Sequence, residues 1–253
     1  MTTPKVSTLK RGGSRFYVNP TTQEKAIGVT SVTGMTPKPW LRYWAVKMAA
    51  EWAVSNLGAV TNLVVSGEQS AAVDLIKRAP DRNTRIASDR GTAIHDLVEK
   101  MNLGQDLGVV HPDFAPDVEI YQTFLDRFQP EFLEVEATVW SKAHGYAGTL
   151  DGICRIDGET IIYDLKTGKG VYPEVALQLA AYAHADFILD PDGTERPIPE
   201  IQGAAVVHLR PEAYELVPVR IDEEIFEVFK ALLAISEWDS TSKKTVLGAV
   251  LNK

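Results

Sequence analysis

A turn dipeptide between two apolar runs constrains this chain more than any other feature of its sequence. Residues 149–156 and 160–166 are rich in β-branched and apolar side chains, and Asp157-Gly158 lies between them. Asp-Gly flanked by such runs is a strong signal for a β-hairpin with a two-residue turn. Counting outwards from that turn places Asp151 directly opposite Asp164.

Two facing carboxylates need a physical reason. Opposed strand residues have Cβ atoms about 5 Å apart, and like charges at that spacing are destabilising. A divalent cation such as Mg²⁺ would hold both, because it takes oxygen ligands. Lys166 shares the strand face of Asp164, since alternate residues point the same way. These groups suit phosphoryl transfer. The alternatives are a solvated strand face neutralised by Lys166, and a bulged turn that shifts the register by one residue.

Length and composition limit the class of protein. At 253 residues the chain can bury a substantial core. Its net charge of -8 is not typical of a protein that coats nucleic acid, although locally clustered basic residues remain compatible with a DNA enzyme. The single cysteine, Cys154, excludes a disulfide framework or a multi-cysteine metal site within one chain, and we expect it in the core.

Hydrophobic patterning predicts a single domain over residues 1–253, with a flexible basic arm at 1–15 and a tail at 239–253. Neither a secretory signal nor a membrane-length apolar segment is recognisable, so we expect a cytoplasmic protein that does not associate with membranes. Periodicity predicts helices at about 38–55, 67–78, 82–101, 116–128, 173–189 and 222–238. It predicts strands on both sides of Asn19-Pro20, from Leu133, in the hairpin, and at about 203–210 and 213–220.

Further candidate residues lie on these predicted elements. His95 follows Gly91 by four residues on one helix face, and Gln178 precedes Tyr182 by the same spacing. Glu134 and Glu136 share one face of the strand before the hairpin, so either could reach a metal held there.

The first predicted long helix carries an aromatic stripe. Trp40, Trp44, Met48 and Trp52 recur every four residues. Such a stripe usually packs into a core, which we expect here. Stacking on unpaired bases is the alternative.

Four motifs occur in a fixed order across about 100 residues. They are Gly-x-x-x-His at 91–95, Gly-x-x-Asp at 148–151, Asp-Leu-Lys-Thr-Gly at 164–168 and Gln-x-x-x-Tyr at 178–182. Together they resemble the PD-(D/E)XK nuclease superfamily, in its RecB-like branch of phage-type exonucleases, which is related to the CRISPR-associated exonucleases. The segments SVTG and PKPWLRYWAVKMAAEWA also resemble phage members.

The resemblance implies an α/β fold with a restriction-endonuclease-like core, in which helices flank a central mixed β-sheet. It implies that His95, Asp151, Asp164 and the Leu165 carbonyl bind the metal, and that Lys166 acts with both aspartates in catalysis. Substrate-binding or supporting positions would be Gln178, Tyr182 and Glu136. Mg²⁺ is the expected ion and Mn²⁺ a substitute, whereas the iron–sulfur cluster of some relatives is excluded because its four cysteines are missing.

The implied function is a metal-dependent exonuclease acting on linear DNA ends during phage or prophage recombination, repair or replication. A phage-encoded enzyme would work in the host cytoplasm, and a single-strand-annealing protein would be a natural partner; an oligomer is also compatible. The alternatives are a structure-specific endonuclease and a non-catalytic DNA-end-binding adaptor. The sequence does not decide the polarity of cleavage, the preference for single or double strands, or the choice between DNA and RNA.

Overall fold

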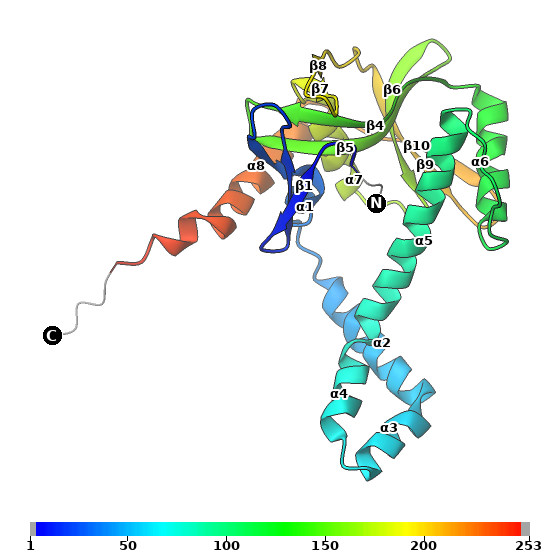
Figure 1. The fold of residues 1–253 in the computed structure, drawn as a ribbon, viewed down its shortest axis with the longest axis vertical. Coiled ribbons are helices and arrows are strands. Elements are labelled where there is room, and N and C mark those ends of the chain that lie inside the picture. Colours follow the sequence, from blue (N-terminus) through cyan, green and yellow to red (C-terminus); the bar gives the residue numbers. More distant parts are fainter. Residues whose placement is uncertain (1–3, 249–253) are drawn as a thin grey trace. The chain divides into compact units, whose positions relative to one another are not determined.

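The computed structural model describes residues 4–248, so the outermost parts of the predicted arm and tail, 1–3 and 249–253, lie outside it. Two compact units make up the chain (Figure 1). We call residues 1–36 with 93–253 the sheet unit, and residues 37–92 the helical unit. The expectation of one functional domain stays a prediction.

Ten strands of the described chain form one sheet. They are β1 Thr8–Arg11, β2 Ser14–Val18, β3 Lys25–Gly28, β4 Glu131–Ser141, β5 Tyr146–Ile156, β6 Glu159–Lys166, β7 Phe187–Leu189, β8 Glu195–Arg196, β9 Gly203–Leu209 and β10 Tyr214–Pro218. The order β1-β2-β3-β5-β4-β7-β8 is extended by β6, which pairs with β5 and β9, and by β10, which pairs with β9. Pairing is parallel for β3 with β5 and for β6 with β9, and antiparallel elsewhere. The sheet is therefore mixed, as predicted.

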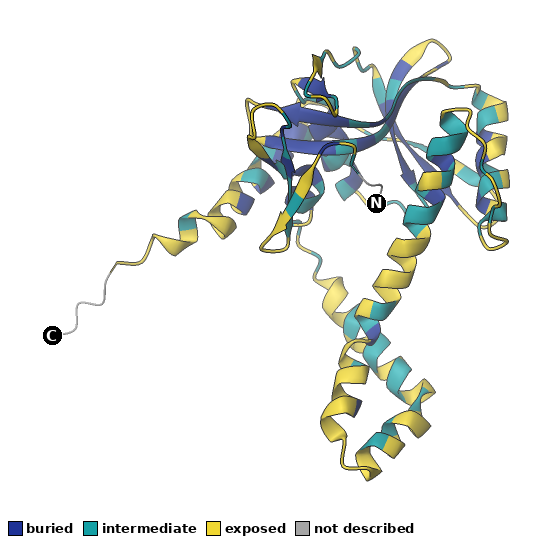
Figure 2. Cartoon of the chain, in the orientation of Figure 1, coloured by how far each residue is buried: buried dark blue, intermediate teal, exposed yellow. Residues whose placement is uncertain are grey.

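Helices cover both faces of this sheet. They are α1 Val29–Thr33, α5 Ala79–Asn102, α6 Ala115–Phe128, α7 Glu174–Ala183 and α8 Glu223–Ser240. One core joins α1, α7 and α8 to inward residues such as Ile162 and Val206. A second core joins the last turns of α5 and all of α6 to their strand neighbours Tyr163 and Val207, which point the other way. This alternation confirms the predicted α/β class with a central sheet flanked by helices. The long strands of the sheet are largely buried (Figure 2).

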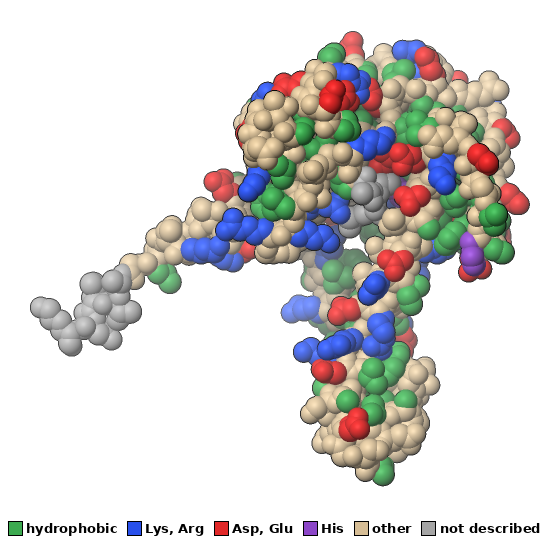
Figure 3. Space-filling view, in the orientation of Figure 1, with side chains coloured by type: hydrophobic (Ala, Val, Ile, Leu, Met, Phe, Trp, Pro, Cys, Tyr) green, Lys and Arg blue, Asp and Glu red, His purple; other side chains and the backbone are tan. Residues whose placement is uncertain are grey.

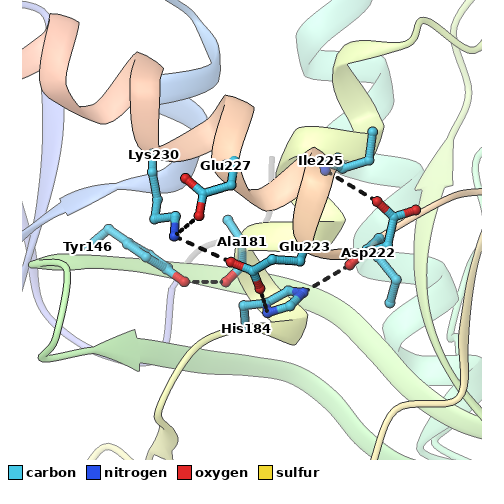
Figure 4. Close-up of polar contacts among 9 residues, drawn as sticks. Tyr146, Ala181, His184, Asp222, Glu223, Ile225, Glu227 and Lys230 are labelled. Atoms are coloured by element: carbon cyan, nitrogen blue, oxygen red, sulfur yellow. Dashed lines mark hydrogen bonds and ion pairs between the residues drawn. The ribbon is translucent and has the colours of Figure 1, made fainter.

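Polar contacts fix α8 against α7 (Figure 4). The His184 ring, just after α7, lies 3.0 Å from the Ile221 carbonyl oxygen. Asp222 caps α8 by accepting from the Ile225 amide. The α7 helix is shorter than the predicted 173–189, because residues 187–189 form strand β7, in which Phe187 and Ile188 pair with β4.

The ends of the sheet unit also depart from expectation. Residues 8–11 of the predicted flexible arm form β1, which pairs with β2 along its whole length. In the predicted tail, Ser242–Lys244 form a short 3₁₀ helix. Cys154 is buried as predicted, and this burial raises the pKa of its thiol to about 12.

The helical unit contains α2 Trp40–Ser55, α3 Leu57–Val65, α4 Gln69–Lys77 and the first part of α5. The sequence did not predict α3. The expected core position of the aromatic stripe is wrong, because α2 has no buried residue and Trp40 is 47% exposed. None of the helices within residues 4–248 is both long enough and apolar enough to cross a lipid bilayer.

Candidate active site

The hairpin has the predicted register. Gly152 faces Tyr163 and Ile156 faces Glu159, with only Asp157 and Gly158 between the strands. Both turn residues have positive φ, 51° and 86°, as a type I′ turn requires. The regular ladder ends at the Gly152–Tyr163 pair, and Asp151 and Asp164 are the next residues on the two strands beyond it.

A third carboxylate extends this pair into a row. On the other side of β5, the β4 residues Val135 and Ala137 face Gly152 and Leu150, so Glu136 lies opposite Asp151. Adjacent strands β4, β5 and β6 therefore each contribute one carboxylate at the same level of the sheet. Glu136 and Asp164 are both buried, at 3% and 2% exposure. Such a row of like charges is unfavourable unless a cation offsets it.

Glu136 reaches this position through an unusual backbone conformation. Its φ is 50°, in the left-handed region that costs a non-glycine residue about 1–2 kcal/mol. Conformational strain of this kind concentrates at functional sites. Glu134 instead forms a two-pronged ion pair with Arg196 at 2.6 and 3.0 Å. Of the two glutamates predicted to reach a metal site, the structure brings Glu136 close to Asp151 and His95, whereas Glu134 pairs with Arg196.

His95 completes a potential ligand set from the last turns of α5. Its Nδ1 lies 3.5 Å from Asp151 Oδ1, and ligand atoms of His95, Glu136 and Asp151 all lie within 4.8 Å of one another. Burial alone would lower the pKa of His95, but the charge of Asp151 raises it overall. Burial acts to raise the pKa of Asp151, yet His95, Lys166 and the Leu165 amide, which donates at 2.7 Å, lower it. Asp151 is therefore held as a carboxylate.

Lys166 and Asp164 form the other half of the site. Their Nζ and Oδ2 atoms are 2.6 Å apart, and Gln178 donates to Asp164 Oδ1 at 2.9 Å. Burial raises the pKa of Asp164 to about 6; the charge of Lys166 opposes this shift and that of Asp151 adds to it. Burial would lower the pKa of Lys166, but Asp164 and Asp151 raise it. The Lys166 side chain is 38% exposed, so its ammonium can meet a ligand from solvent.

The two α7 candidates differ in position. Gln178 contacts Asp164 directly, whereas Tyr182 is only 2% exposed and belongs to the core. A Cβ atom on Gly148 would lie 2.5 Å from Tyr182 Cε1. The glycine of Gly-x-x-Asp thus lets β5 approach the Tyr182 ring of α7 closely, and Tyr182 is a packing residue of this core.

A small pocket opens between His95, Glu136, Asp151 and Leu165. Its volume is about 10 Å³, roughly that of one water-sized sphere. The pocket therefore has room for a single small ion or water molecule beside the ligand atoms.

Sequence reasoning missed the residues that support this site. Asn102 donates to the Tyr163 hydroxyl at 2.9 Å and accepts from the Tyr121 hydroxyl at 2.8 Å. It follows His95 by seven residues on the same helix face, a spacing that could have identified it. His208, fully buried beside Lys166 in the parallel ladder, lies 2.8 Å from the Gly168 carbonyl oxygen. No sequence signal indicated His208.

No protein-family model matches the chain, and the curated proteins give no significant match. We therefore infer the function from the residues themselves.

Proposed function

We propose that this protein is a metal-dependent DNA exonuclease of the PD-(D/E)XK type, with a restriction-endonuclease-like core in its sheet unit. The observation that carries the proposal is the cluster of His95, Glu136 and Asp151, whose ligand atoms lie within 4.8 Å of one another. Beside it, on the neighbouring strand β6, Asp164 and Lys166 form an ion pair at 2.6 Å. The ordered sequence motifs support the same assignment. A role in phage or prophage recombination beside a single-strand-annealing protein stays a prediction.

The donor set fits the expected ion. Carboxylate oxygens favour Mg²⁺, and the His95 imidazole makes Mn²⁺ a ready substitute. Glu136 joins the predicted ligands because its atoms lie in reach of those of His95 and Asp151. The Leu165 carbonyl stays a predicted ligand. A metal bound here would lower the pKa of a bound water and offset charge on the attacked phosphate.

The protein's own groups have separable roles. The Asp164 and Asp151 carboxylates raise the pKa of Lys166 in the metal-free protein. Its ammonium is placed to orient or help deprotonate the water and to offset charge on the phosphate. Asp164 positions that ammonium, and Gln178 fixes the Asp164 carboxylate. Cleavage would leave a 5′-phosphate and a 3′-hydroxyl, as in the family.

The test compares linear DNA labelled at either end with a covalently closed circle, in Mg²⁺, Mn²⁺ or EDTA. We expect metal-dependent loss of linear DNA alone, with Lys166→Ala inactive yet folded by circular dichroism. Lys142→Ala is the matched control, because Lys142 is ion-paired to Glu195 away from the site. Cutting of the circle would indicate the endonuclease alternative. Binding without cleavage in every metal would indicate the adaptor and overturn the proposal.

A further inference from the structure

The helical unit has a charge of opposite sign to the rest of the chain. Residues 37–92 carry eight lysines and arginines against five acidic residues, whereas the remaining residues carry 18 against 29. In Figure 3, Lys and Arg side chains on this unit are interleaved with hydrophobic ones. Local positive charge on an otherwise acidic protein attracts a polyanion to that unit.

The same unit exposes apolar and aromatic side chains. Among its residues only Ala72 and Ala79 are buried. Trp40 and Tyr43 are 47% and 73% exposed. An exposed apolar surface on this scale marks an interaction site. Combined with positive charge, exposed aromatic rings are the features that single-stranded nucleic acid binding requires.

A pocket of about 560 Å³ lies between α2 and the first part of α5, entirely within the helical unit. The guanidinium carbon of Arg82 lies 4.8 Å from the centre of the Trp52 ring. The Arg82 guanidinium also donates to the Leu75 carbonyl oxygen at 2.9 Å, and this hydrogen bond fixes its position. Met48 and Ile86 provide apolar walls, while the nearby Asn83 adds hydrogen-bonding groups.

We propose that this pocket binds an unpaired base of single-stranded DNA on a platform formed by Trp52 and Arg82. The proposal rests on the proposed nuclease function for its choice of DNA, and it deepens that function by adding a strand-binding site in a separate unit. A base has a flat face for the ring and the guanidinium, and polar edges for Asn83. In a duplex these faces are covered by stacking, so the pocket favours single strands.

The test measures binding of a fluorescent 20-mer of oligodeoxythymidine, and of a 20-base-pair duplex, by anisotropy in EDTA so that no cleavage occurs. We expect Arg82→Gln and Trp52→Leu to weaken binding of the single strand by about tenfold. Arg85→Gln is the matched control: it removes the same charge from the same helix, but Arg85 is paired with Asp89 outside the pocket. Trp52→Phe keeps a ring and should retain most of the affinity.

The possible results distinguish the strand-binding pocket from the nuclease function. Equal binding by Arg82→Gln and Arg85→Gln, with circular dichroism showing folded helices, would overturn the strand-binding pocket while leaving the nuclease intact if linear DNA is still cleaved. Pocket-dependent binding without cleavage in any metal would instead remove the nuclease. Self-association that is lost in Trp52→Leu, with DNA affinity unchanged, would assign the pocket to a second copy of this chain and overturn the proposal.

Discussion

At the scale of one residue, Glu136 combines three features that each lower the stability of the fold. Its backbone is left-handed, its side chain is buried, and it lies opposite Asp151 in a row of like charges. Each of these features is unfavourable for a solvated or purely structural glutamate. All three become useful when the row holds a cation.

Glu136→Gln should therefore separate stability from metal binding. Removing one charge from the row should leave the metal-free protein at least as stable, because repulsion falls while the side-chain shape is kept. We expect affinity for Mn²⁺, measured by titration calorimetry, to fall by about tenfold or more, and cleavage to fall with it. Glu134→Gln is the control, since it breaks only the ion pair with Arg196. Unchanged Mn²⁺ affinity in Glu136→Gln would remove this residue from the ligand set.

Asp164 gives the metal-free protein a distinctive pH dependence. Its folded-state pKa of about 6 lies above the unfolded value of about 3.9, so the native state holds the extra proton between these pH values. Stability contributed by the protonated form is present below about pH 4 and is lost as pH rises to about 6.

Comparison with Asp164→Asn isolates the pH-dependent stability that Asp164 contributes, because asparagine does not titrate. In EDTA, the free energy of unfolding of the wild type minus that of Asp164→Asn should fall by about 2 kcal/mol from pH 4 to pH 7. Urea unfolding at several pH values measures the difference. A difference that stays constant, or that grows with pH, would contradict a raised pKa for Asp164.

At the scale of elements, the sequence predicted those parts of the site that depend on contacts between residues close together in the chain. The Asp-Gly turn fixed the register of the hairpin, and Asp151 and Asp164 follow directly after its last regular pair. The position of Gln178 beside Asp164 was implied only by the family resemblance, because helical spacing relates Gln178 to Tyr182 and not to β6. The left-handed Glu136 was not predictable, because its strand alternates regularly in sequence and the irregularity arises only against β5.

In the helical unit, the sequence predicted a helix but not the surroundings of its aromatic side chains. Periodicity located α2 and its aromatic stripe correctly, yet it says nothing about what faces that stripe. In the structure no residue of α2 is buried, and Trp52 lines a pocket with Arg82 instead of entering a core. Amphipathic spacing is the same for a helix that packs on a core and for one that binds a ligand.

The β5–β6 turn carries a prediction at this scale. Gly158 has φ of 86°, so Gly158→Ala should lower the free energy of unfolding by about 1–2 kcal/mol, measured in urea. Gly203→Ala is the control, because its Cβ would meet Ile161 at 3.5 Å, an ordinary contact. We expect cleavage at 25 °C to persist in both variants, since β4 and β9 hold the strands on either side. Loss of cleavage by folded Gly158→Ala would show that the turn alone maintains the register.

For the whole molecule, charge is divided unevenly between the two units. The sheet unit concentrates acidic groups, including the buried row, and is poorly suited to approach DNA without a cation. The basic excess lies in the helical unit. A bound metal ion would therefore have two effects. It would activate a water molecule. Its positive charge would also reduce the repulsion between the acidic sheet unit and a phosphate backbone.

A bound metal should also stabilise the folded protein, because the row does not exist in the unfolded chain. Free metal at 10 to 100 times its dissociation constant would add about 1–3 kcal/mol. For a chain of this length that raises the unfolding temperature by about 2–4 °C per kcal/mol. We expect this rise with Mg²⁺ or Mn²⁺ over EDTA, measured by circular dichroism of the sheet.

Two controls separate this effect from general screening of an acidic protein. NaCl at matched ionic strength should give a smaller rise, since it screens surface charge without entering the pocket. Asp151→Asn should lose most of the metal-specific part, because Asp151 is the middle member of the row, while its amide oxygen can still accept from the Leu165 amide. An equal rise in Asp151→Asn would mean that the ions act on the acidic surface as a whole, and that the row of carboxylates is not a metal site.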